Sequence, residues 1–193
     1  MRKIIASTFV TLDGYMVGPN EDISWVMNNF NEEMGDYAGD LMNSMDTILL
    51  GRVTYEVMIK VWPYQTEATS PGADKMNTTP KIVFSRTLKK AEWGTYQNAV
   101  VMKDNIVEEM AKLKQQPGKN MVIYGSANLV QGFTQLGLID EYQLLVHPLV
   151  LGKGKPLFAG MADGHPSGIN LKLLKTEPYK NGVIVLYYQP KTD

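Results

Sequence analysis

Short apolar runs recur along the first two thirds of the chain and are not interrupted by polar alternation. They are residues 4–10, 47–50, 81–85, 99–102 and 120–124. A strand that is covered on both faces has this pattern, because neither of its sides meets water. These runs therefore predict buried strands of a largely parallel sheet.

Apolar residues between these runs recur at helical spacing. One stripe begins at Met34 and continues at separations of 3, 4, 7, 8 and 11 residues, through Tyr37, Ala38, Leu41, Met42 and Met45. Two shorter stripes lie in residues 106–113 and 129–136. Residues at these separations share one face of a helix. Strands that alternate with helices indicate βαβ units around a parallel sheet.

In the last third of the chain the alternation of predicted strands and helices gives way mainly to strands. Residues 141–151, 169–177 and 182–189 read as strands, and no helical pattern separates the last two. Asn181-Gly182 between them is a strong hairpin signal. We therefore predict an α/β fold: a central mixed, mostly parallel sheet of about eight strands flanked by helices, with an antiparallel C-terminal edge. At 193 residues, a single domain over residues 1–193 is expected.

Residues 63–80 form the one long polar stretch that contains proline and glycine. Loops of this length are uncommon inside compact domains, and they serve as mobile connectors or as active-site lids. The sequence leaves both roles open.

Composition removes several classes of function. The net charge is -1 and no run of four basic residues occurs, so neither nucleic acid nor an anionic membrane is expected as a partner. The absence of cysteine excludes disulfides and thiolate zinc sites, and His147 and His165 lack spaced partners, so no metal site is predicted. No apolar window reaches the roughly 18 residues of a membrane span. A cytoplasmic protein is expected.

The chain turns after its second apolar run with residues suited to a phosphate. Gly51 would let the backbone approach the ligand, Arg52 could fork onto a phosphate, and Thr54 offers a hydroxyl beside the free N–H groups of a helix start. The same residues also fit a plain glycine turn with a surface arginine and a threonine helix cap.

Two more strand ends carry similar chemistry. Ser85 and Arg86 follow the third run, and a second arginine at one sheet edge suits the extra 2′-phosphate that distinguishes NADP from NAD. Gly125 and Ser126 follow the fifth run and open a helix, where a pyrophosphate can lie. A solvated arginine and a serine cap explain these turns as well, and the G-x-G-x-x-G fingerprint is missing.

Three segments together resemble a known family. GRVTYE (51–56) resembles the G-R-x-T-[WY]-E element of dihydrofolate reductases, and LDGYM (12–16) resembles the start of the reductase domain of RibD-type riboflavin-biosynthesis enzymes. The most specific match is to the latter's L-[IV]-D-E and P-x-x-x-G-x-G-x-x-L-F signature, in residues 137–158. The resemblance covers residues 2–188.

The resemblance implies a dihydrofolate reductase-like fold and NADPH as the cofactor. It would place Gly51, Arg52 and Thr54 at the cofactor phosphates and Ser85 and Arg86 at the 2′-phosphate. The pyrophosphate and nicotinamide ribose would meet a further set of residues, namely Gly125, Ser126, Ala127, Asn128 and Leu129.

The implied activity is hydride transfer to a C=N or C=O carbon of a small heterocyclic substrate, as in the 5-amino-6-(5-phosphoribosylamino)uracil reductase of riboflavin biosynthesis. A proton donor is also needed. Asp36 lies one residue from the position expected for the acid of dihydrofolate reductases. Asp13 either contacts substrate or shapes an Asp-Gly turn. A nucleotide-binding protein without turnover is the alternative.

The resemblance also implies an oligomeric state, since relatives are commonly homodimers. Tyr187 and Tyr188 lie side by side in an apolar C-terminal strand that could cover a partner as well as the core. A homodimer is therefore expected.

Overall fold

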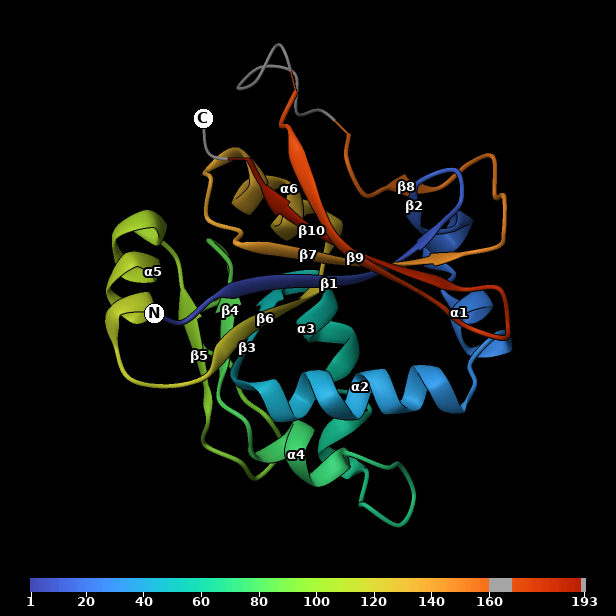
Figure 1. Ribbon diagram of the computed structural model, residues 1–193. Coiled ribbons are helices and arrows are strands. Elements are labelled where there is room, and N and C mark those ends of the chain that lie inside the picture. The colour runs from blue at the N-terminus through green and yellow to red at the C-terminus, as the bar shows by residue number, and fades with distance from the viewer. Residues whose placement is uncertain (160–167, 192–193) are drawn as a thin grey trace.

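The central sheet has eight strands over residues 1–159 and 168–191, which a computed structural model describes (Figure 1). These strands are β1 (Ile4–Thr11), β3 (Met45–Gly51), β4 (Lys81–Phe84), β5 (Ala99–Met102), β6 (Asn120–Gly125), β7 (Glu141–His147), β9 (Leu171–Pro178) and β10 (Ile184–Pro190). Their order across the sheet is β5-β4-β3-β6-β1-β7-β10-β9. A separate two-stranded ladder joins β2 (Tyr15–Val17) to β8 (Lys155–Pro156).

Strand directions follow the prediction. All pairs from β5 to β7 are parallel, whereas β10 runs antiparallel to both β7 and β9. The β9–β10 hairpin turns at Gly182, whose φ of +84° is costly for any residue with a Cβ. The predicted strand over 141–151 is too long, because β7 ends at His147. Pro148 follows, and proline has no N–H to continue a ladder.

Helices cover both faces of the sheet. They are α1 (Ser24–Asn28), α2 (Glu32–Ser44), α3 (Arg52–Met58), α4 (Ala73–Thr78), α5 (Ile106–Gln115) and α6 (Ala127–Gln135), with short 3-10 turns at Pro19–Glu21 and Trp62–Tyr64. Leu41, Tyr55 and Met76 bring α2, α3 and α4 to one core, while Met110 and Phe133 bring α5 and α6 to another. No helix in the described ranges is long and apolar enough to cross a bilayer.

The polar stretch 63–80 is not the long loop that the sequence predicts. It contains α4, whose Ala73, Met76 and Asn77 are buried. The Asn77 amide donates to the Trp62 carbonyl at 2.9 Å. Because α4 leads into Lys81 at the amino end of β4, this segment lies beside the amino ends of the strands, on the opposite side of the sheet from their carboxyl ends. The interpretation of this segment as a lid over the carboxyl ends is therefore wrong.

Candidate functional site

The carboxyl ends of β3, β4 and β6 bring the three candidate turns to one rim of the sheet. Gly51 pairs with Phe84 across β3 and β4, and Leu50 pairs with Gly125 across β3 and β6. Adjacent strands lie about 4.8 Å apart, so the three turns start within about 10 Å of one another. Chain segments that are far apart in sequence thus share one rim, as the sequence predicts.

Two of these turns are in direct contact. A Cβ on Gly51 would lie 2.6 Å from Ser126 Oγ and 3.1 Å from Ser126 N. A Cβ on Gly125 would lie 3.0 Å from Thr54 Oγ1, and Gly125 also has a φ of +127°. Glycine is needed at both positions because the backbone of each turn lies directly against a residue of the other turn, Ser126 at Gly51 and Thr54 at Gly125. The sequence predicted open space for a ligand at Gly51, and the neighbouring turn fills that space.

The β6–α6 turn presents the start of a nine-residue helix. Ser126 is the N-cap residue, but its hydroxyl makes no capping hydrogen bond. The side chains of Ala127 and Leu129 are buried, and that of Asn128 is exposed. At this turn an anion can therefore be bound by free backbone N–H groups, by the Ser126 hydroxyl and by Asn128. Ala127 and Leu129 contribute backbone and shape only.

The two arginines of the rim are in different states. Arg52 is exposed and its Nη1 lies 2.9 Å from both carboxylate oxygens of Glu56, one helical turn away. Such exposed pairs contribute little free energy, so Arg52 can exchange Glu56 for another anion at low cost. Arg86 is exposed and forms no ion pair within residues 1–159 and 168–191. The Ser85 hydroxyl accepts from Thr87 N and Leu88 N and so holds its own turn.

Asp13 joins two loops at the same rim. Its carboxylate accepts from Thr11 Oγ1 at 2.6 Å, from Leu151 N at 3.1 Å and from Gly152 N at 2.7 Å. The hydrogen bond from Thr11, with those from Gly152 and Leu151, lowers the pKa of the Asp13 carboxyl although desolvation opposes this. An ionised carboxylate held by three donors supports the turn-shaping interpretation of Asp13.

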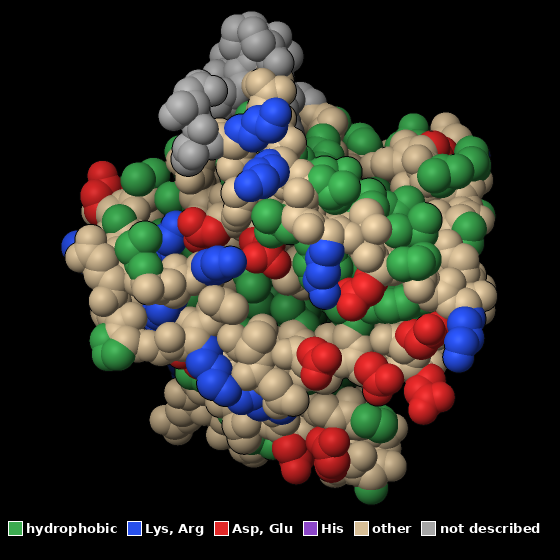
Figure 2. Space-filling view, in the orientation of Figure 1, with side chains coloured by type: hydrophobic (Ala, Val, Ile, Leu, Met, Phe, Trp, Pro, Cys, Tyr) green, Lys and Arg blue, Asp and Glu red, His purple; other side chains and the backbone are tan. Residues whose placement is uncertain are grey.

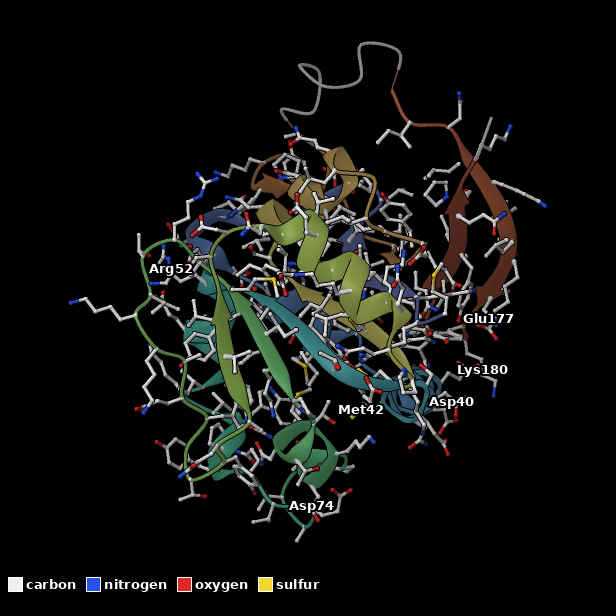
Figure 3. All side chains as sticks on the ribbon, turned by 90° about the vertical axis from the view of Figure 1, so that its left-hand side faces the viewer. Asp40, Met42, Arg52, Asp74, Glu177 and Lys180 are labelled. Atoms are coloured by element: carbon white, nitrogen blue, oxygen red, sulfur yellow. The ribbon has the colours of Figure 1, made fainter. Side chains whose placement is uncertain are left out.

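Asp36 lies away from the three turns. It lines a groove of about 400 Å³ between α2 and the antiparallel edge, together with Glu33, Tyr37, Asp40, Leu41, Ser44, Gln143, Lys175, Glu177, Tyr179 and Tyr187. None of the turn residues borders this groove. Figure 2 shows a row of acidic side chains over α2. In Figure 3 Asp40 and Glu177 lie on the opposite side of the molecule from Arg52. The structure does not bring Asp36 to the candidate cofactor residues.

The sequence missed a cavity at the same rim. It measures about 320 Å³ and lies between α1 and the end of β7, lined by Trp25, Asn28, Asn29, His147, Pro148 and Leu149. His147 pairs with Thr11 at the end of β1, so the cavity opens beside the strands that carry the candidate turns. The sequence interpretation tested His147 only as a metal ligand. Its alternation with Gln143 and Leu145, which points it to the α1 side, was the available signal.

Comparisons with known proteins find relatives over nearly the whole chain. The model of the RibD C-terminal domain matches residues 2–185. The uncharacterized protein YyaP of Bacillus subtilis (strain 168) is 37% identical over 192 residues, which is 97% of this chain and 94% of YyaP.

Solved structures share the fold at low identity. A putative riboflavin biosynthesis protein from Shewanella sp. PV-4 superposes with a TM-score of 0.78 at 23% identity, covering 98% of this chain and 99% of that one. The diaminohydroxyphosphoribosylaminopyrimidine deaminase/5-amino-6-(5-phosphoribosylamino)uracil reductase of Thermotoga maritima gives 0.72 at 16% identity, covering 98% and 57%. Dihydrofolate reductase from Enterococcus faecalis, complexed with NADP(H), gives 0.62 at 13%, covering 98% and 97%. The fold is dihydrofolate reductase-like.

Proposed function

The chain belongs to the RibD C-terminal domain family, and on this basis we propose that it is an NADPH-dependent reductase of a small heterocyclic substrate. One observation carries the proposal: the turns at Gly51, Ser85 and Gly125 meet at one rim of the sheet. Proteins of this fold include one solved with NADP(H). The substrate of the Thermotoga maritima relative, a phosphoribosylaminouracil, is one candidate within this class.

The residues present fit the cofactor. The Ser126 hydroxyl makes no capping bond and Arg86 makes no ion pair with any described residue, so both are available to phosphate oxygens. The start of α6 adds backbone N–H groups for the pyrophosphate. Arg86, with Arg52 released from Glu56, supplies positive charge for the 2′-phosphate. Bound NADPH would supply the hydride from its nicotinamide ring.

The chain's own residues hold and orient the cofactor. Ser126 lies against Gly51 and Thr54 lies against Gly125, so both hydroxyls belong to the joined turns and would fix the ribose-phosphate backbone. Neither Asp13 nor Asp36 is a free carboxyl group beside the candidate cofactor residues. Asp13 is at the rim but already accepts three hydrogen bonds, and Asp36 borders a different groove. This arrangement is the specific observation that favours the second candidate, an NADP(H)-binding protein without turnover.

Calorimetric titration with NADPH and NADH tests the cofactor assignment. We expect NADPH to bind at least about tenfold more tightly, because a 2′-phosphate paired with arginine adds a charge-assisted hydrogen bond. Arg86→Ala should remove most of that preference, and Arg52→Ala part of it. Lys172→Ala, on the exposed edge strand β9, is the matched loss of charge and should change nothing. Equal affinity of the unmodified protein for both cofactors would contradict the proposal.

Turnover separates the two candidates. Oxidation of NADPH in the presence of pyrimidine or pteridine substrates, followed as loss of the absorbance of the reduced nicotinamide, supports the reductase. Tight NADPH binding without oxidation across that panel supports the binding protein.

We also propose a homodimer through the face of β7 and β10 that α1 and α2 do not cover. Val185 and Tyr187 are buried toward α1 and α2, whereas Ile184 on the opposite face is 41% exposed. Ile184 pairs with the half-buried Val146, which extends the apolar surface onto β7. A second copy would bury this surface. Sedimentation equilibrium of Ile184→Lys should show a monomer if this face is the interface, and a dimer that survives the substitution would contradict it.

A further inference from the structure

Trp25 of α1 and His147 at the end of β7 carry buried polar atoms that have no partner among the described residues. His147 is 1% exposed and Trp25 is 8% exposed. Neither ring nitrogen of His147 nor Nε1 of Trp25 hydrogen-bonds to any group in the described part of the chain. A buried polar atom left unpaired costs roughly 1–3 kcal/mol. Three such atoms in one place indicate a site that is built for something other than stability.

Packing fixes the orientation of these rings. The Trp25 and His147 ring centroids lie 4.9 Å apart at an interplanar angle of 84°, and Phe9 lies 5.8 Å from His147 at 74°. The imidazole therefore packs against two aromatic rings. Burial lowers the pKa of His147 and keeps the ring neutral near pH 7. A neutral imidazole offers one donor and one acceptor, and the Trp25 indole adds a second donor.

No charged side chain is among the described residues that line the cavity next to these rings. Its lining consists of two aromatic rings, the amides of Asn28 and Asn29, and the apolar Pro148 and Leu149. A phosphate bound there would meet no lysine or arginine of the described lining, so burying its charge would be costly. Apolar walls with a few convergent polar groups are typical of a site for a small uncharged molecule.

The cavity also lies where a bound molecule could meet the proposed cofactor. His147 ends β7, β1 is the next strand, and β6 with Gly125 follows. Two strand spacings amount to about 10 Å. The cover over the cavity is slight, since α1 has five residues, its N-cap Ile23 is 51% exposed and its own Met27 is 68% exposed. A helix of this length has little stability of its own, so α1 can shift and expose the three shielded nitrogens.

We propose that Trp25 and His147 form a binding site for a neutral, unphosphorylated heteroaromatic molecule with a lactam edge. The lactam carbonyl accepts from Trp25 Nε1, and the adjacent N–H donates to the acceptor nitrogen of His147. The ring lies between Leu149 and the amides of α1. That this molecule is the hydride acceptor rests on the proposed function, whereas its binding does not.

The first test uses uracil as the probe and nitrogen NMR of labelled histidine as the readout. The chain has two histidines, so the variant His165→Asn assigns the signal of His147. Uracil should shift the His147 signal and leave that of His165 in place. Two related probes test the chemistry. 1,3-Dimethyluracil lacks the N–H donors and uridine 5′-monophosphate adds a phosphate, and each should bind at least about tenfold more weakly, a factor worth 1.4 kcal/mol.

Two variants test the residues. His147→Phe and Trp25→Phe each keep an aromatic ring and remove the nitrogens, and each should weaken uracil binding at least about tenfold. His147→Phe should unfold at the same or a higher temperature than the unmodified protein, because it removes unpaired buried nitrogens. Loss of binding in that variant therefore cannot be attributed to unfolding. NADPH affinity, measured on the same samples, should stay unchanged in both.

Three results would overturn the proposal. They are no shift of the His147 signal at the solubility limit of uracil, unchanged uracil affinity in His147→Phe, and tighter binding of uridine 5′-monophosphate than of uracil. Failure of the proposed function looks different. In that case NADPH does not bind to the unmodified protein, and uracil still shifts His147.

Discussion

The amino ends and the carboxyl ends of the parallel strands form two rims of the central sheet, called here the amino edge and the carboxyl edge. Buried polar groups have hydrogen-bond partners at the first and lack them, among the described residues, at the second. At the amino edge, before β4, Asn77 is fully buried and its amide donates to the Trp62 carbonyl while its Oδ1 accepts from Trp93 Nε1 at 2.8 Å. At the carboxyl edge, the ring nitrogens of His147, Trp25 Nε1 and the Tyr124 hydroxyl have no partner among the described residues.

The amino edge even satisfies a buried amine. Lys81 is 1% exposed, donates to the Asn77 carbonyl at 2.7 Å and lies 4.4 Å from the centroid of the Trp93 ring. Arg2 at the start of β1 likewise donates to Asp46, to Thr47 Oγ1 and to the Lys119 carbonyl. Asn98 Oδ1 is the exception, although its amide nitrogen contacts three carbonyls.

The contrast indicates that the two edges serve different ends. Satisfied networks hold one unique arrangement of the chain. Unpaired groups lower stability, and natural proteins keep them where a ligand uses them. Loss of the Asn77 amide at the amino edge should therefore lower stability, whereas loss of the unpaired His147 nitrogens at the carboxyl edge should raise it, and the following experiments test this comparison.

The largest effect is expected at the amino edge. Asn77→Leu keeps the branching of the side chain but leaves Trp93 Nε1 without its acceptor and removes the bond to the Trp62 carbonyl, which then keeps only Gln65 N as a donor. We expect the free energy of unfolding to fall by about 3 kcal/mol, measured by urea denaturation. NADPH affinity of the folded variant should not change. A loss below about 1 kcal/mol, the typical effect of a substitution, would show that this network is not special.

Lys81 should make stability depend on pH. Burial lowers the pKa of its amine to about 7, whereas the unfolded chain binds this proton up to about pH 10.4. Between pH 7 and 9 the unfolded state therefore holds more protons, and stability should rise with pH by about 2 kcal/mol.

Lys81→Met should abolish that rise and raise stability at pH 7, since Asn98 Nδ2 still donates to the Asn77 carbonyl at 2.7 Å. Urea denaturation at pH 7, 8 and 9 checks this. Parallel pH profiles of the two proteins would contradict the assignment.

His147→Phe at the carboxyl edge should change stability in the opposite direction to Asn77→Leu. Removing unpaired nitrogens should raise the free energy of unfolding at pH 7 by up to about 1 kcal/mol. Burial lowers the pKa of His147, so the unfolded chain gains a proton below about pH 6.5 that the folded chain resists. The unmodified protein should therefore lose more stability between pH 7 and 5.5 than the variant. A destabilised variant would mean that an unseen partner satisfies His147.

The smallest effect is expected at Asp13. Asp13→Asn weakens the hydrogen bonds to Leu151 N and Gly152 N and should loosen the loop at Lys153. Trypsin should then cut after Lys153 severalfold faster, with little change in thermal midpoint. Asp36→Asn, in the α2 groove, is the matched control and should leave cleavage unchanged. Complete loss of reductase activity with an intact loop would instead restore Asp13 as a catalytic residue.

Much of the fold could be predicted because its signals are local. The apolar runs at 47–50, 81–85 and 120–124 became β3, β4 and β6. Errors arose where one residue or one contact outweighed the pattern. Pro148 ended β7 early, and buried Asn77 and Met76 fixed a stretch that reads as a polar loop.

Local patterns in the chain were enough to predict the succession of strands and helices, the antiparallel hairpin at Gly182, and the three turns at the ends of β3, β4 and β6. Periodicity, glycine and proline act on neighbouring residues, so these features are visible in the chain. Two features became visible only in the folded chain: Asp36 borders another groove, and Trp25 lies against His147. That contact exists because β7 inserts between β1 and β10 and carries His147 under α1. No spacing along the chain encodes such a meeting, because it depends on which strands become neighbours.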